Sequence, residues 1–404
     1  MLLMVAPLLS SAVNWWGSEY CFSIDFKEVK LMAMSHKTKI LAAARKQPVD
    51  KLPFGARIDV WYNYNCGHGT MPDKYKGTNI VEILRDQDAG AQIRHLRIWR
   101  IEYDDLELVT HKDPPYTTTE WRTPIGNVSQ KTIFRPEEGP WIAYEIDHPF
   151  KGEKDYPVIE YILKHTRLVP DLSEYLEKEA MMGEQGIIVT GMDLYSPMQQ
   201  VMRYWLGYEA FFYELFDRPA RVERLYELEK ELAKKKLEIL AESPIEMPMI
   251  CGNWSDEFHT PVFEKYFAPW LKEASDYLHA QGKLTMVHID GEMKRLIPLF
   301  GNTGIDVGEA WSPAPMTSVT TGELRRAWCD QVTIWGGIPA VLFEPSQYSD
   351  EEFDRYIINL FKEIAPGYNF IVGMGDNLPF DGSIERVGRV AELIDKYGSL
   401  PIEL

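Results

Sequence analysis

The sequence has no CxxC pair of cysteines and no excess of basic residues. Its four cysteines, Cys21, Cys66, Cys251 and Cys329, form no CxxC motif, which argues against a zinc site made only of cysteine and fits a protein of the reducing cytoplasm. Acidic residues number 61 against 43 basic ones, and the formal net charge is -18. Such a charge repels the nucleic-acid backbone and anionic membrane surfaces. We therefore expect a small-molecule substrate or a protein partner, with no role for nucleic acid or a membrane.

The N-terminal apolar run also lacks the basic residue that begins an export signal. The stretch MLLMVAPLLSSAVNWWG has no Lys or Arg before it, and the first basic residue is Lys27. The run is too short to span a bilayer. A later methionine, Met34, begins a stretch typical of a helix that ends at a proline-marked turn. We predict that residues 1–33 are a peripheral extension and that residues 34–404 form the folded domain.

What is present from about residue 185 onward is an alternation of short apolar strands and amphipathic helices, which predicts a parallel sheet. Strands are expected at 186–192, 245–253, 283–291, 305–311, 331–339 and 368–376, and helices at 196–217, 219–243, 261–282, 321–328, 350–364 and 383–397. Further strands at 53–62 and near 95–101 give enough units for a (β/α)₈ barrel, an α/β TIM barrel.

Residues 100–150 interrupt this alternation. Here β-branched and polar residues alternate between Pro and Gly turns, a pattern typical of antiparallel hairpins. We interpret this segment as an insertion that caps one mouth of the barrel.

Polar residues at the ends of the predicted strands are the candidates for chemistry, because a TIM barrel builds its active site at the C-terminal ends of its strands. His288 and Asp290 end one strand and point to the same side, since side chains alternate along a strand. Glu309 ends the next strand, and neighbouring strands lie about 4.8 Å apart. We predict a metal site of His288, Asp290 and Glu309, with an open position that suits catalytic zinc. Iron or manganese is not excluded by these ligands.

Other strand ends carry amide, acidic and aromatic side chains. Asn253 and Asp256 follow one strand, and Asp376 with Asn377 follows the last. The aromatic residues at or beside strand ends suit a flat aromatic substrate or the face of a large cofactor; they are Trp61, Tyr62, Tyr64, Trp254, Trp311 and Trp335.

The sequence contains two other groups of possible metal ligands. Glu223, Glu238 and His259 form a Glu, Glu, His series, but the two glutamates share one predicted helix and would lie about 22 Å apart. Cys66 and His68 lie on a glycine-flexible loop with no obvious third ligand. Met374, between two glycines, is expected to line the core or a pocket.

Several longer stretches resemble the uroporphyrinogen decarboxylase-like superfamily, over nearly the whole chain from Met34. They are SPMQQVMRYWLGYEAFFYELFDRPARV, YLHAQGKLTMVHIDGEMKRLIPLFGNTGIDVGEAW, VTIWGGIPAVL and GYNFIVGMGDNLPFDGSIERVGRVAELIDKYG. The decarboxylases of that superfamily have an arginine-rich N-terminal motif for the substrate carboxylates, whereas FGARIDVWYNYNCG here has Arg57 alone. The cobalamin-dependent methyltransferases have a zinc site of one histidine, one carboxylate and two cysteines. His288 and Glu309 match the first two, and Asp290 and Met374 stand where the cysteines would be.

The resemblance, with these departures, implies a methyltransferase of the O-demethylase type. The chain would move a methyl group from a methoxylated, aromatic compound to the cob(I)alamin of a separate corrinoid protein. Zinc at His288, Asp290 and Glu309 would polarise the ether oxygen, because carboxylates leave the ion more electrophilic than thiolates do. We expect Tyr62, Tyr64, Trp311 and Asn377 to bind the donor, and Asn253 and Asp376 to orient it or relay a proton.

Two alternatives remain open from the sequence. One is a metal-free decarboxylase in which Asp290 or Asp376 is the acid, and the other is a non-catalytic protein that binds a corrinoid or porphyrin. A demethylase needs both metal and reduced corrinoid, a decarboxylase needs neither, and a carrier binds pigment without turnover. The sequence also leaves a homodimer open.

Overall fold

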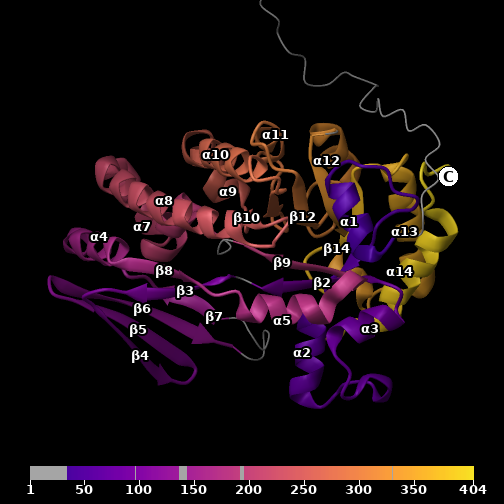
Figure 1. Ribbon diagram of the computed structural model, residues 1–404, viewed down its shortest axis with the longest axis horizontal. Coiled ribbons are helices and arrows are strands. Elements are labelled where there is room, and N and C mark those ends of the chain that lie inside the picture. The colour runs from indigo at the N-terminus through magenta and orange to yellow at the C-terminus, as the bar shows by residue number, and fades with distance from the viewer. Residues whose placement is uncertain (1–33, 96, 136–142, 192–194, 330) are drawn as a thin grey trace, which may run out of the picture.

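A computed structural model describes residues 34–404 except 96, 136–142, 192–194 and 330 (Figure 1). The predicted extension, residues 1–33, lies outside the described residues. Within the described chain, no helix combines the length and apolarity that a bilayer crossing requires.

Eight parallel strands, counted over the described residues, form the barrel. One sheet contains β1 (Gly55–Ala56), β2 (Gly90–His95) and β9 (Gly186–Thr190). The other contains β10 (Met249–Cys251), β11 (Met286–His288), β12 (Val307–Trp311), β13 (Thr333–Ile338) and β14 (Phe370–Met374). Single parallel bridges join the two sheets at both edges, Gly191 to Met249 and Phe54 to Val372. The strands therefore follow one another round a ring, and the expected (β/α)₈ barrel is confirmed.

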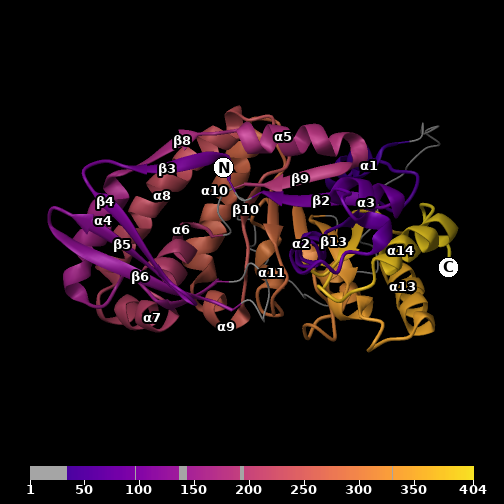
Figure 2. The ribbon, with the colours of Figure 1, turned by 90° about the horizontal axis from the view of Figure 1, so that it is seen from below.

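Helices surround this ring (Figures 1 and 2). In chain order after α1 (His36–Ala44) they include α2 (Asp59–His68), α3 (Ile80–Asp86), α6 (Pro197–Gln199), η4 (Gln200–Trp205), α7 (Tyr208–Asp217), α8 (Pro219–Glu242), α9 (Asp256–His259), η6 (Phe263–Phe267), α10 (Ala268–His279), α11 (Ile297–Phe300), α12 (Thr321–Trp328), α13 (Asp350–Ile364) and α14 (Ile384–Tyr397). Local sequence fixes their starts: the Ser349 hydroxyl accepts the Glu352 N–H at the beginning of α13, and the Glu352 carboxylate accepts the Ser349 N–H.

The segment between β2 and β9 is an insertion, and it extends past both predicted limits, residues 100 and 150. Its strands β4 (Glu107–Asp113), β5 (Tyr116–Thr123), β6 (Gly126–Phe134) and β7 (Ala143–Asp147) make one antiparallel sheet, which confirms the predicted hairpins. β3 (Trp99–Tyr103) pairs antiparallel with β8 (Thr166–Pro170), and the helices of the insertion are α4 (Tyr156–Lys164) and α5 (Ser173–Met182). The sheet lies with α7 and α8 at one end of the molecule, while α13 and α14 lie at the other (Figures 1 and 2). Its role as a cap stays a prediction.

Helix α1 (His36–Ala44) closes the N-terminal end of the barrel. Its Ile40 and Leu41 pack in one buried cluster with side chains of the barrel interior, including Met249, Met286 and Val307. This apolar plug leaves the opposite end, where the strands terminate, for polar side chains.

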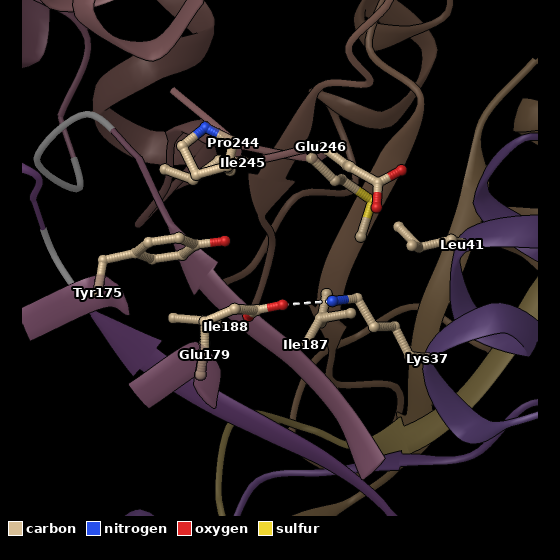
Figure 3. Close-up of a pocket in the computed structure, with 10 residues that line it drawn as sticks. Lys37, Leu41, Tyr175, Glu179, Ile187, Ile188, Pro244, Ile245 and Glu246 are labelled. Carbon is tan, nitrogen blue, oxygen red and sulfur yellow. Dashed lines mark hydrogen bonds and ion pairs between the residues drawn. The ribbon is translucent and has the colours of Figure 1, made fainter. Parts of the chain in front are cut away.

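A small cavity lies beside helix α1 at this end of the barrel. It has a volume of about 40 Å³ and lies between α1, α5 and the start of β9. An ion pair between Lys37 and Glu179 closes one side (Figure 3). A space of this size holds ordered water and not a substrate.

Three sequence-based assignments were wrong in detail. The first barrel strand does not reach residue 62, because α2 begins at Asp59. The strand expected near 95–101 is two strands: β2 ends at His95, and β3 belongs to the insertion. The helix expected at 196–217 is broken at Gly207, whose φ of 79° ends one helix and begins another.

Candidate active site

The C-terminal ends of β11 and β12 place a histidine beside a glutamate inside the barrel. The strand register pairs His288 with Glu309, and His288 Nδ1 lies 2.7 Å from Glu309 Oε2. The two residues are only 2% and 1% exposed. Strand β2, across the ring, completes the group: Gln92 Nε2 donates to Glu309 Oε1, and Arg94 Nη2 donates to Glu309 Oε2 at 3.1 Å. Glu309 is therefore held from two sides.

These contacts define which nitrogen of His288 is available to bind a metal. A carboxylate at 2.7 Å from Nδ1 can only accept, so Nδ1 carries a proton and donates it to Glu309. Arg94 Nη2 also lies 3.1 Å from Nδ1, but two donors cannot bond each other, so Arg94 bonds Glu309 alone. The lone pair of the neutral ring is then on Nε2. Metal-binding histidines are oriented by carboxylates in this way.

The Nε2 side of His288 faces two aspartates. Asp290 Oδ2 lies 3.4 Å from Nε2, and Asp376 Oδ1 lies 3.6 Å from it. One ligand atom from each of these three residues lies within 4.8 Å of the others, and no other such group of three occurs among the described residues. The two aspartate side chains are 34% and 45% exposed, so the group opens to solvent. One nitrogen and two carboxylate oxygens fit a zinc ion that keeps a position for substrate.

Charge sets the ionisation of this group. Burial and Arg94 act to lower the pKa of His288, but Asp290 and Glu309 outweigh them and the pKa rises to about 9. Burial acts to raise the pKa of Glu309, whereas Arg94 and His288 bring it well below its usual range. In the absence of a metal, His288 at neutral pH is therefore an imidazolium between carboxylates.

A second network links Asp376 to the start of the barrel. Arg57 Nη1 donates to Asp376 Oδ1 at 2.5 Å, and Arg57 Nε donates to Asp59 Oδ1 at 2.8 Å. Burial acts to lower the pKa of Arg57, but Asp59 and Asp376 raise it above its usual range. Asn377 Nδ2 donates to Asp59 Oδ1 at 3.0 Å, and Asn377 Oδ1 accepts from the Val60 N–H. Asn377, predicted to bind substrate, is 6% exposed and ties the end of β14 to α2.

The family model of uroporphyrinogen decarboxylase (URO-D) matches residues 127–397, more than half of the chain. The chain belongs to this family. Among solved structures, a methyltransferase from Methanosarcina mazei aligns with a TM-score of 0.59 and 13% sequence identity, over 90% of this chain and 99% of that one. At this identity the likeness shows a shared fold. Comparison with curated protein sequences gives no match.

In this member of the URO-D family, three strand ends carry unusual backbone. Asn253, Ala310 and Asp376 have positive φ values of 55°, 66° and 69°. Asn253 and Asp376 follow β10 and β14, and Ala310 is the last residue but one of β12. Such conformations cost energy in non-glycine residues and cluster at functional sites. Asn253 is half-buried and Tyr195 hydrogen-bonds to it.

The backbone at Ala310 explains why Trp311 does not reach the site as expected. The register between β12 and β13 shifts between Glu309 and Trp311, so Ala310 is an extra residue that turns the next side chain. Trp311 Nε1 donates to Thr321 Oγ1 of α12 at 3.2 Å, and its side chain is fully buried. It has no face for a ligand.

The two predicted tyrosines lie on α2 and not at a strand end. Tyr64 stacks on His68, with ring centroids 4.0 Å apart, and packs on Phe380 at 4.8 Å. The Tyr62 hydroxyl donates to the Thr78 carbonyl at 3.2 Å. Donor binding by these residues stays a prediction.

The remaining candidates have structural contacts. Asp256 accepts the backbone N–H groups of Arg295 and Leu296. Glu223 and Glu238 share the single helix α8, as expected, so they cannot hold one ion. His259 is buried and its Nδ1 lies 2.9 Å from the Ser255 backbone nitrogen, so Nδ1 accepts that N–H.

Sequence reasoning missed Gln92 and Arg94. Both lie on the strand whose position was predicted wrongly. Their spacing of two, in GAQIRH, is the signal that could have placed them on one face of a strand.

Proposed function

We propose that this URO-D family member is a metal-dependent methyltransferase that moves a methyl group from a methoxylated, aromatic compound to the cob(I)alamin of a separate corrinoid protein. The observation that supports it best is the orientation of His288, with Nδ1 on Glu309 and Nε2 facing two aspartates. The name of the solved relative, a methyltransferase, agrees with this function.

The geometry favours a revised ligand set. The sequence predicted His288, Asp290 and Glu309, but Glu309 lies on the ring nitrogen that points away from Asp290. Asp376 occupies the position on the Nε2 side. We therefore assign zinc binding to His288, Asp290 and Asp376, with Glu309 as the residue that orients the imidazole.

Each residue then has a defined role. A zinc ion, when bound, supplies Lewis acidity toward the ether oxygen of the donor. Glu309, held by Gln92 and Arg94, keeps Nδ1 of His288 protonated and Nε2 available. In the reaction the bond between oxygen and the methyl carbon breaks, its electron pair stays on oxygen, and the methyl group passes to cob(I)alamin. Asp290 or Asp376 would return a proton to that oxygen.

The decarboxylase alternative has less support at this site. A substrate with many carboxylates needs uncompensated cations. Arg57 pairs with Asp59 and Asp376, and Arg94 pairs with Glu309. These two arginines are therefore neutralised by the protein's own acids.

Metal analysis combined with turnover tests the proposal. The purified wild-type protein should contain about one zinc ion per chain, and His288→Ala should contain none and be inactive. His279→Ala is the matched control, because His279 is a surface residue that pairs with Asp306, and it should keep both metal and activity. Turnover is followed as demethylation of a methoxylated aromatic compound with reduced corrinoid protein. Full activity of His288→Ala without bound metal would refute this function.

A further inference from the structure

Asp376 offers the same oxygen atom to two partners. Its Oδ1 accepts a hydrogen bond from Arg57 Nη1 at 2.5 Å and lies 3.6 Å from His288 Nε2. A carboxylate oxygen has two lone pairs, so Oδ1 can bind the guanidinium and a metal ion at the same time. Electron density that this oxygen gives to the guanidinium is no longer available to the ion. Arg57 therefore lies where it changes the properties of an ion bound by His288, Asp290 and Asp376.

The Arg57 side chain is fixed in this position. Arg57 is 9% exposed, and its Nε and Nη2 donate to the two carboxylate oxygens of Asp59 at 2.8 and 3.2 Å. Its backbone carbonyl accepts the N–H of Leu378, two residues beyond Asp376, at 2.9 Å. The pair with Asp59 sets the plane of the guanidinium and leaves Nη1 for Asp376. Since a guanidinium keeps its proton in proteins, the positive charge beside Asp376 is permanent.

The other aspartate of the proposed site has no such partner. Among the described residues Asp290 forms one ion pair, with His288, and no arginine or lysine pairs with it. The two aspartates are therefore unequal as ligands. Asp290 keeps its charge for the ion, whereas Asp376 shares its charge with Arg57. Arg57 also repels a cation at this place directly.

We infer that Arg57 is a positioning residue that keeps Asp376 a weak ligand, which lowers the affinity for zinc and leaves a bound ion more electrophilic toward the donor oxygen. The inference rests on the proposed function for the metal and for the reaction. It gives Arg57 the opposite effect to Glu309: loss of Glu309 weakens zinc binding, and loss of Arg57 strengthens it. A residue that only supports the fold would not produce that increase.

Zinc competition against a chelating dye, with the full-length protein, tests this effect. Arg57→Met keeps an unbranched side chain without the charge, and zinc should bind at least about tenfold more tightly than to the wild type. Arg57→Lys keeps the charge and should stay within about threefold of the wild type. Arg389→Met is the matched control. Arg389 also forms two hydrogen bonds with one aspartate, Asp354, but it does so between the outer helices α14 and α13, so its loss should leave the zinc affinity unchanged.

A double variant protects the test against loss of folding. Arg57→Met leaves Asp59 without its partner, and adding Asp59→Asn removes that second charge. The double variant should still bind zinc at least about threefold more tightly than the wild type. In turnover at saturating zinc, kcat of Arg57→Met should fall at least about tenfold with the KM for the donor unchanged, because the ion is less electrophilic and the donor contacts are intact.

Two results would overturn the inference alone. One is zinc affinity equal to or below that of the wild type in both Arg57→Met variants, and the other is Arg57→Lys that binds zinc as tightly as Arg57→Met. Dye titration needs neither donor nor corrinoid, so tighter zinc binding in Arg57→Met without demethylation by the wild type would count against the proposed function alone. A wild type that binds no zinc would overturn both.

Discussion

Replacing Glu309 by glutamine separates the two possible roles of this residue. The side chain keeps its size but loses its charge, so His288 Nδ1 loses the carboxylate at 2.7 Å and Arg94 loses its anion. If Glu309 orients the imidazole, zinc still binds to His288, Asp290 and Asp376, but more weakly. If Glu309 is a ligand, as the sequence suggested, binding is lost with it.

The expected magnitudes follow from burial. Removing a residue that orients a metal-binding histidine costs about 10- to 100-fold in affinity, which is about 1.4 to 2.8 kcal/mol. The Arg94 side chain is 10% exposed and that of Glu309 is 1% exposed, and breaking such a buried pair lowers the free energy of unfolding by about 3–5 kcal/mol. Glu309 also raises the pKa of His288. Loss of the carboxylate therefore lowers that pKa, so that at pH 7 protons compete less with zinc for His288. The affinity loss should therefore be larger at pH 9 than at pH 7.

Zinc competition against a chelating dye measures these affinities. Asp376→Asn should lose far more affinity than Glu309→Gln. Asp59→Asn is its control, because it breaks the other ion pair of Arg57 and leaves the three ligands intact. Loss of all zinc in Glu309→Gln, as complete as in His288→Ala, together with wild-type affinity in Asp376→Asn, would show that our ligand assignment is wrong.

Three further predictions use simpler readouts. Since the pKa of His288 is raised to about 9, zinc must displace a proton from His288 below that pH. In dye titrations the zinc affinity should therefore rise about tenfold per pH unit from pH 7 to 9 and then level off. The metal-free protein should lose thermal stability over the same pH range, because the stabilising imidazolium of His288 deprotonates. Gly252→Ala should lower the affinity for zinc at least about tenfold, since the added Cβ would lie 2.6 Å from the Cβ of His288. The control Gly67→Ala should leave the affinity unchanged, because no atom lies within 4 Å of a Cβ added there. Trp311→Phe should leave the KM for the donor unchanged, and a raised KM would contradict the placement of Trp311 in the core. It should lower the free energy of unfolding by about 2–4 kcal/mol in urea titrations, because it removes the hydrogen bond to Thr321 and leaves a cavity where the larger indole was buried.

The barrel was predictable where its strands are apolar. The strands β10 to β14 are buried along their length, and their hydrophobic runs stand out between amphipathic helices. The prediction that His288 and Asp290 face the same side is confirmed, although β11 ends at His288 and Asp290 follows it by two residues. Trp311 follows Glu309 at the same spacing, yet it turns away. The positive φ at Ala310 that causes this is not encoded by a glycine, so alternation alone could not predict it.

The strand that the sequence did not place is the one that organises the candidate site. In β2 the residues that point into the barrel are Gln92 and Arg94, and both bond Glu309. Polar residues at those positions remove the hydrophobic pattern by which strands are recognised. The cost of removing these two polar side chains from water is offset by their hydrogen bonds to Glu309, a residue far away in the sequence. The inward polar residues that made β2 hard to recognise therefore also indicate function. A barrel strand with polar residues on its inner face needs buried partners across the ring, and here that partner, Glu309, orients His288.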